Sequence, residues 1–334
     1  MGRADPISVT VAIDTEEDDW GSYAEDGASV SNIGLLPEFQ ASLDRWGARP
    51  TYLVNRPPLV NAESVRVLGA LAQRDDVEIG GHCHPWNTPP STGTSADRSM
   101  MSRLTVDQNR GKIREITTRV EQELGVRPTT FRAGRWGFGP TVAEALSAEG
   151  YRVDSSVSPF MDWSADGGPD HTMAPHHPYR FHPAAPFTPT PDGPMVELPT
   201  TIGFFRFPQR TAGRTINRLE RSWLAHLKLV GLLDVAGLLT RRWLSPETSS
   251  GEEMIKLARG WLASGERVLA LTLHSAALLP GATPFVRSVD DRKRLLRSME
   301  TFLRYCADSG YRFRTLGETG RAVLGGGDRV AVED

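Results

Sequence analysis

The sequence predicts an α/β fold in which parallel strands alternate with helices. Apolar runs typical of buried strands, such as residues 7–13 and 268–273, alternate with longer segments whose apolar residues recur at helical spacing. Clusters of polar side chains directly follow several of these runs. Units in this order form either a (β/α) barrel or a doubly wound sheet. The polar clusters favour the barrel, because a barrel gathers the ends of its strands at one mouth.

Strand and helix segments follow one another through the first half of the chain. The first strand is predicted at 7–13, where every second residue is a large apolar one. Further strands are predicted at 50–54, 77–79, 129–132 and 151–153, with helices at 36–46, 65–71, 106–124 and 142–146 between them. Gly47, Gly125 and Gly150 follow three of these helices, as expected at helix ends.

The second half is less regular. Residues 159–199 hold 10 of the 24 prolines and half of the histidines and lack periodicity, which predicts a long ordered loop across the site. After a short strand at 195–198, helices are predicted at 215–243 and 252–262, a strand at 268–273, a helix around 295–302, a strand at 311–313 and a terminal helix. We predict one catalytic domain over 1–334, with the 159–199 loop and a helical insertion at 213–245 over the site.

Composition excludes several classes of protein. The 334 residues are 39% hydrophobic and 24% charged, as in ordinary globular domains. The net charge of -3 comes without a basic stripe, so nucleic acid is not an expected partner. Two cysteines form no disulfide framework, and neither a signal peptide nor a transmembrane segment is recognisable, which predicts a cytoplasmic protein. The amphipathic segment 216–243 favours a core or dimer surface, so a homo-oligomer is left open.

The first polar cluster follows strand 7–13 and contains five carboxylates between residues 14 and 19. In an extended chain, residues i and i+2 point to the same side, so Asp14 and Glu16 would face one pocket while Thr15 faces away. A cation between the carboxylates would relieve their repulsion. The alternative is a solvated acidic loop, which is what most runs of charge are.

The second cluster contains His82 and His84 on either side of Cys83. In an extended segment their imidazoles share one side of the chain. With Glu16 they would form a set of two histidines and one carboxylate, which catalytic zinc uses and which iron, cobalt or nickel also accept. The alternative is a pair of hydrogen-bonded loop histidines.

His274 directly follows the apolar strand 268–273. A histidine at this end of a strand is a candidate catalyst, whereas within a strand it is more often a packed core residue. Asp14, if spared from the metal, can take a proton from water while His274 protonates a leaving nitrogen. This pairing describes hydrolysis of an amide.

The order of these clusters resembles the polysaccharide deacetylase, or NodB-homology, family of metal-dependent N-deacetylases, over nearly the whole chain. The family's first motif matches Asp14 as base and Glu16 as metal ligand, in the variant with one residue between them. Its second motif resembles residues 78–82, but the family's second metal histidine lies four positions later, where this chain has Trp86. The resemblance therefore implies His84 as the substitute ligand.

A histidine of the 159–199 loop, His176 or His177, is the alternative to His84 as metal ligand. The third motif resembles residues 131–136, which implies that Arg132 orients the base and that Trp136 lines the groove.

The fourth motif implies that Asp154 tunes the same network, and an ion pair between Arg132 and Asp154 is also compatible with the sequence. The fifth motif resembles residues 271–275, with His274 as general acid and Leu273 as a wall of the acetyl pocket. Trp86 is expected to contact substrate together with Trp136 and Leu273.

By resemblance the fold is a distorted (β/α) barrel of about seven strands. The implied cofactor is one divalent metal ion, zinc before cobalt, nickel or iron. The implied activity is removal of acetyl from a small N-acetyl amino sugar, in a glycan precursor, a glycoside, or a surface-polysaccharide or natural-product pathway. A hydrolase of a non-sugar amide and an inactive sugar-binding homologue are the alternatives.

Overall fold

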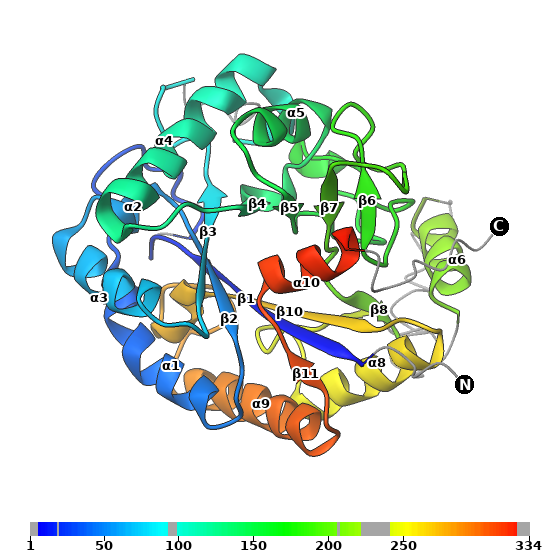
Figure 1. Cartoon of the computed structure of the whole chain (residues 1–334). Helices are drawn as coiled ribbons and strands as arrows, with labels where there is room; N and C mark the ends of the chain where they lie inside the picture. The colour runs from blue at the N-terminus through cyan, green and yellow to red at the C-terminus, as the bar shows by residue number, and fades with distance from the viewer. Residues whose placement is uncertain (1–5, 19, 93–98, 206–207, 222–240, 326–334) are drawn as a thin grey trace.

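A curled, mostly parallel sheet forms the centre of the computed structural model, which describes residues 6–18, 20–92, 99–205, 208–221 and 241–325 (Figure 1). The strands of this nine-stranded sheet are β1 (Ser8–Thr15), β2 (Pro50–Val54), β3 (Glu78–Cys83), β4 (Thr130–Ala133), β5 (Val153–Asp154), β6 (Tyr179–Phe181), β7 (Met195–Glu197), β10 (Val268–His274) and β11 (Arg312–Phe313). Seven neighbouring strands run parallel in the order β10-β1-β2-β3-β4-β5-β7. β6 joins β7 antiparallel, and β11 pairs with β1.

Most of the helices lie outside the curled sheet, whereas α10 lies within its ring of strands (Figure 1). They are α1 (Leu36–Asp44), α2 (Arg56–Leu59), α3 (Ala62–Ala72), α4 (Val106–Leu124), α5 (Pro140–Ala148), α6 (Gln209–Arg221), α8 (Gly251–Ala263), α9 (Val289–Asp308) and α10 (Leu316–Leu324). α4, α8, α9 and α10 each begin with a capping box, in which a Ser or Thr side chain and the residue three positions later satisfy each other's backbone N–H groups.

α10 closes one end of the sheet's interior. Its Leu316 and Val323 pack with Ala12, Leu53 and other inward-facing strand residues in a small inner core. The backbone N–H groups of Leu316 and Gly317 donate to Thr51 and Glu78, near the amino ends of β2 and β3. Because α10 covers the amino ends of the strands, a ligand can reach the interior of the sheet from the carboxyl ends.

The barrel is distorted because strands do not close it between β7 and β10. Residue Thr201, just after β7, bridges this gap with its backbone and side chain, which both bond to Ala270 of β10. A separate antiparallel pair, β8 (Ile202–Phe204) and β9 (Arg241–Trp243), follows there. As a result, β9 lies beside the carboxyl ends of the strands, where its Trp243 lines the cavity.

The predicted fold class is confirmed, and the expected count of strands matches the seven parallel neighbours. Two local predictions were wrong. The strand expected at 195–198 forms as β7, but the segment before it is not one long loop, because β6 forms there and pairs with β7. Residues 241–243 form β9 where a helix was expected, whereas 222–240 of the predicted helical insertion lie outside the described residues. No helix in the described part of the chain is long and apolar enough to cross a membrane.

Candidate active site

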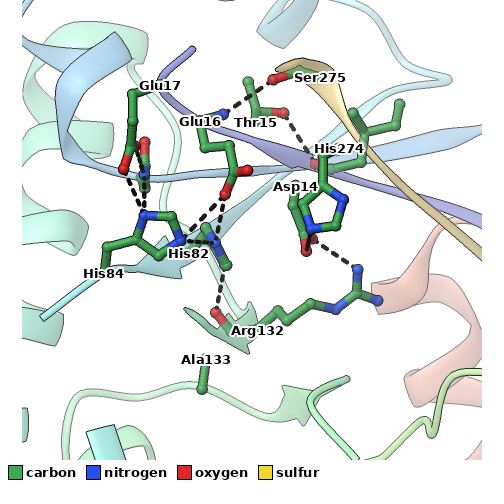
Figure 2. Close-up of polar contacts among 12 residues, drawn as sticks. Asp14, Thr15, Glu16, Glu17, His82, His84, Arg132, Ala133, His274 and Ser275 are labelled. Carbon is green, nitrogen blue, oxygen red and sulfur yellow. Dashed lines mark hydrogen bonds and ion pairs between the residues drawn. The ribbon is translucent and has the colours of Figure 1, made fainter. Parts of the chain in front are cut away.

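A cavity of about 410 Å³ opens at the carboxyl ends of the strands. Its polar lining includes Asp14, Glu16, His82, His84 and His274, and aromatic side chains form much of the remainder. The structure therefore brings together the polar clusters that end β1, β3 and β10 (Figure 2). This volume lies in the range of small-molecule pockets.

Glu16, His82 and His84 form a compact triangle of potential metal ligands. The Nε2 atoms of the two histidines lie 3.1 Å apart, and Glu16 Oε2 lies 3.4 Å from His82 and 3.2 Å from His84. Ligands of a tetrahedral zinc ion at ordinary bond lengths are about 3.3 Å apart. The three side chains thus fit one divalent ion without rearrangement.

The tautomers of the two histidines also fit a metal site. His82 Nδ1 lies 2.9 Å from the Arg132 carbonyl oxygen, which can only accept, so Nδ1 carries the proton and Nε2 keeps its lone pair. His84 Nδ1 lies 2.8 Å from a carboxylate oxygen of Glu17, which orients its ring in the same way. Both Nε2 atoms therefore face Glu16 (Figure 2).

Local sequence explains why His84 occupies this position. The indole of Trp86 stacks on the His84 ring, with centroids 4.2 Å apart and planes 21° apart. A Cβ on Gly134 would lie 2.4 Å from His84 Cδ2, so only glycine leaves room for the ring. Trp86, which stands where the family has its second histidine, thus supports the imidazole of His84 and lines the cavity.

Glu17, which the sequence analysis did not assign, anchors His84. Its carboxylate also accepts hydrogen bonds from Asn55 and Asn87. Burial disfavours the charged imidazole, but Glu17 and Glu16 outweigh burial and raise the pKa of His84 to about 10. Because a metal ligand must be an unprotonated imidazole, metal binding displaces a proton from His84. The only signal for Glu17 in the sequence was its place in the acidic cluster.

Burial also disfavours the charged form of the Glu16 carboxyl. The positive charge of His274, hydrogen bonds with His82 and His84, and the charge of His84 more than offset this effect and hold the pKa of Glu16 well below its usual range. Glu16 is therefore a carboxylate, the form that binds a cation, throughout the physiological pH range. Its backbone N–H donates to Ser275 Oγ, which ties the end of β1 to the end of β10.

Asp14 faces the cavity beside this triangle and pairs with Arg132. Arg132 Nη1 donates to Asp14 Oδ1 over 2.7 Å and to Thr272 Oγ1 over 2.7 Å. The guanidinium, 1% exposed, also donates to the carbonyl oxygen and hydroxyl of Ser155. Arg132 thus orients Asp14, as the resemblance implied, and also joins β4 to β5 and β10.

His274 lies on the other side of Asp14. The two residues are register partners on the neighbouring strands β10 and β1, and His274 Nε2 is 3.8 Å from Asp14 Oδ2. His274 Nδ1 lies 3.0 Å from Glu247 Oε2, and the backbone N–H of His274 donates to Glu247 Oε1. Nε2 is therefore the nitrogen that faces the cavity and Asp14.

Glu247 is the second functional residue that the sequence analysis missed. Burial lowers the pKa of His274, but the Glu247 carboxylate, with Glu16 and Asp14, raises it to about 10. His274 is thus protonated at neutral pH and able to donate a proton. Glu247 lies in an irregular segment after β9, where no periodicity indicates which strand end it approaches.

Asp154 does not pair with Arg132 among the described residues, so the ion pair considered from the sequence was wrong. Asp154 and Glu197 are register partners on β5 and β7, and both are fully buried. Burial raises the pKa of both carboxyls, and the charge of Asp154 raises that of Glu197 further, so the pair keeps a proton near neutral pH. Asp154 accepts hydrogen bonds from the backbone N–H and the hydroxyl of Ser156, and Arg132 acts on it only as a nearby positive charge.

The assignment of Leu273 was wrong, and the alternative to His84 as metal ligand was wrong too. Leu273 does not line the cavity; it is fully buried in the outer core, because adjacent strand residues point to opposite faces and His274 faces inward. His176 and His177 do not approach Glu16. They lie with Glu266, and His176 Nε2 is 3.2 Å from the Glu266 carboxylate. Trp136 lines the cavity as expected, and so does Trp163 from the 159–199 segment.

The fold is similar to that of two solved structures. A candidate polysaccharide deacetylase of Mycobacterium smegmatis is 17% identical, with a TM-score of 0.55 over 100% of this chain and 97% of that one. A candidate glycoside hydrolase/deacetylase of Parabacteroides distasonis is 13% identical, with a TM-score of 0.61 over 95% of this chain and 71% of that one. No protein-family model and no curated protein matches the sequence. The resemblance to polysaccharide deacetylases is thus confirmed at the level of the fold.

Replacing Glu17 by Gln is expected to weaken metal binding by about 10- to 100-fold, because His84 loses the negative partner that orients and polarises it. The measurement is competition with a chromophoric chelator at constant pH. Glu25→Gln, an exposed neighbour in sequence, is the control and should leave affinity unchanged. Equal metal affinity of Glu17→Gln and the wild type would contradict this role.

Replacing Glu197 by Gln is expected to flatten the dependence of stability on pH. Carboxyls with raised pKa stabilise the fold at low pH, and this contribution is lost as pH rises through the raised pKa. Between pH 5 and 9 the free energy of unfolding of the variant should therefore fall by about 1 kcal/mol less than that of the wild type. Urea titrations at each pH measure the free energy of unfolding, and Glu63→Gln, at an exposed side chain, is the control. If the free energies of unfolding of the wild type and Glu197→Gln change equally with pH, the buried pair of Asp154 and Glu197 does not hold a proton near neutral pH.

Proposed function

We propose that this protein is a metal-dependent hydrolase that removes the acetyl group from an N-acetyl amino sugar. The observation that carries the proposal is the division of one cavity into two halves. Glu16, His82 and His84 form a ligand triangle on one side, and Asp14 and His274 form a carboxylate and imidazolium pair on the other. This set serves hydrolysis of an amide.

Glu16, His82 and His84 would hold the metal ion, which supplies a Lewis acid to polarise the amide carbonyl and lower the pKa of water. Asp14 accepts a proton from the attacking water. Its carboxylate is spared from the metal because Arg132 holds Oδ1, which leaves Oδ2 on the side of His274. The ligand set does not select between zinc, cobalt, nickel and iron, although zinc suits it best.

His274 delivers a proton to the leaving nitrogen. As the C–N bond breaks, its electron pair stays on nitrogen and takes the proton from Nε2, while the water oxygen stays on the acyl carbon. The products are acetate and a free amine. The proton that Asp14 took can return to His274, since the two groups lie 3.8 Å apart, and this restores the starting state.

The choice of an acetylated amino sugar rests on the names of the structures with the same fold, a polysaccharide deacetylase and a glycoside hydrolase/deacetylase. A non-sugar amide remains the alternative substrate, because fold and metal do not fix it. An inactive homologue was suggested by the missing histidine at position 86. The position of His84 Nε2, 3.2 Å from Glu16 Oε2, supports an active enzyme over this alternative. The unpaired buried Cys83 and Cys306 fit the proposed cytoplasmic location.

Replacing Asp14 by Asn is expected to lower the turnover number at least about a hundredfold, because the general base is lost, while metal content stays near that of the wild type. The measurement is acetate release from N-acetyl amino sugars by the zinc-loaded enzyme, with elemental analysis alongside. Asp192→Asn, an exposed carboxylate away from the cavity, is the matched control. Turnover of Asp14→Asn near the wild-type rate would remove Asp14 from the mechanism, and absence of acetate release from every sugar would refute the proposed function.

Replacing Glu247 by Gln is expected to shift the alkaline limb of the pH dependence of kcat/KM to lower pH by about one unit or more. The direction follows because Glu247 raises the pKa of His274, so its removal makes His274 lose its proton sooner as pH rises. The acid limb should move less. An unchanged alkaline limb would mean that His274 is not the proton donor.

A further inference from the structure

Three tryptophans form a continuous apolar surface along one side of the cavity. Trp136 follows β4, Trp163 precedes a short helix at Ser164–Asp166, and Trp243 ends β9. Trp243 meets the other two rings edge to face, with centroids 5.3 Å from Trp136 and 6.4 Å from Trp163. All three are half-buried and line the cavity. We call these residues the indole wall.

The backbone holds this surface in place at a conformational cost. Trp136 and Arg135 have φ angles of 58° and 53°, in the left-handed region that bulky side chains avoid. Tyr23, at 52°, also lines the cavity. Strained residues of this kind persist where surrounding structure enforces them, and they cluster at binding and catalytic sites. The strain at Trp136 thus supports a binding role for its indole.

A second aromatic pair lies beside the proton donor. Trp20 contacts His274 edge to face at 4.8 Å and Phe285 at 5.4 Å. Trp20 and Phe285 are 44% and 38% exposed, an unusual exposure for such large apolar rings. The indole wall begins at Arg132, whose Cζ lies 5.3 Å from the centre of the Trp136 ring. Both aromatic surfaces therefore start at the residues that flank Asp14.

The charges of the cavity disfavour an anionic substrate. Asp14, Glu16, Glu17 and Glu247 are all carboxylates of its lining. In the described lining the guanidinium of Arg135 is the one permanent cation, and it is engaged by Ser99 and lies over the ring of Tyr23 at 5.3 Å. The imidazolium of His274 also faces the cavity, but it is paired with Glu247, so a phosphate would find no unpaired cation among the described lining residues besides the metal.

We propose that the indole wall binds a flat, uncharged, apolar ring attached to the sugar, so that the preferred substrate is a neutral N-acetylated aryl glycoside. Aromatic rings stack on indoles through apolar contact and ring electrostatics, which a small alkyl group cannot match. The assignment of this group to the substrate's sugar rests on the proposed function. A nucleotide diphosphate in the same place is excluded by the carboxylates, and a long polar glycan lacks the apolar ring.

The experiment measures binding by calorimetry to the zinc-loaded Asp14→Asn protein, which is expected to bind substrate with little turnover. The probes are 4-nitrophenyl N-acetyl-β-D-glucosaminide, methyl N-acetyl-β-D-glucosaminide and UDP-N-acetylglucosamine. The aryl glycoside should bind at least about tenfold more tightly than the methyl glycoside, and the UDP-sugar more weakly than either. Adding Trp243→Ala should abolish the preference for the aryl glycoside and change the affinity for the methyl glycoside by no more than about twofold. Trp243→Phe, in place of Trp243→Ala, should keep most of the preference for the aryl glycoside.

Phe285→Ala is a second variant, at an exposed side chain whose loss should leave the fold intact. It should weaken binding of the aryl glycoside less than Trp243→Ala does, because Phe285 lies outside the indole wall. Equal binding of aryl and methyl glycosides, tightest binding of the UDP-sugar, or an aryl preference that survives Trp243→Ala would each overturn the proposal. If the aryl preference is found but the wild type releases acetate from none of the probes, the binding site stands and the proposed function fails.

Discussion

The buried ion pair between Arg132 and Asp14 is the contact on which the site depends. It joins β4 to β1 across the interior, and the same guanidinium bonds Thr272 of β10 and Ser155 beyond β5. Breaking such a pair leaves an uncompensated charge in the interior, at a cost of about 3–5 kcal/mol. Arg132 therefore fixes both the orientation of Asp14 and the spacing of the strand ends around the cavity. Its carbonyl oxygen also orients His82, so one residue acts on both halves of the site.

One imidazole in each half of the site has a carboxylate behind it. Glu17 stands behind His84 and Glu247 behind His274, and each bonds to Nδ1 and leaves Nε2 toward the cavity. The two pairs have opposite chemical consequences. In the proposed mechanism a metal ion displaces the proton of His84, because Glu16 and His82 share the coordination, whereas His274 lies outside this ligand triangle and keeps its proton. The cavity thus holds the ligand triangle and the imidazole of His274 on opposite sides of Asp14.

Large aromatic side chains in strained or exposed positions surround the polar residues of the cavity. The left-handed backbone at Trp136 and the exposure of Trp20 both cost free energy in the absence of a ligand. The outer helices and the inner core supply the rigidity that keeps these side chains where they are. A rigid scaffold with an apolar, sterically defined mouth binds a flat ligand at low conformational cost.

The sequence by itself determined most of the parallel strands, the helices between them and the side of the chain on which neighbouring polar residues point, but not β6 or β9. Side-chain alternation placed Asp14 with Glu16 and His82 with His84, since these are local geometric consequences of an extended backbone. The same alternation sends Leu273 away from His274, into the core. Only the tertiary structure decided the long-range partners: Glu17 with His84, Glu247 with His274, and Glu197 with Asp154. Those pairs depend on the order of the strands in the sheet and on the irregular segments between strands. Such segments have no periodic pattern from which a contact with a distant side chain could be predicted.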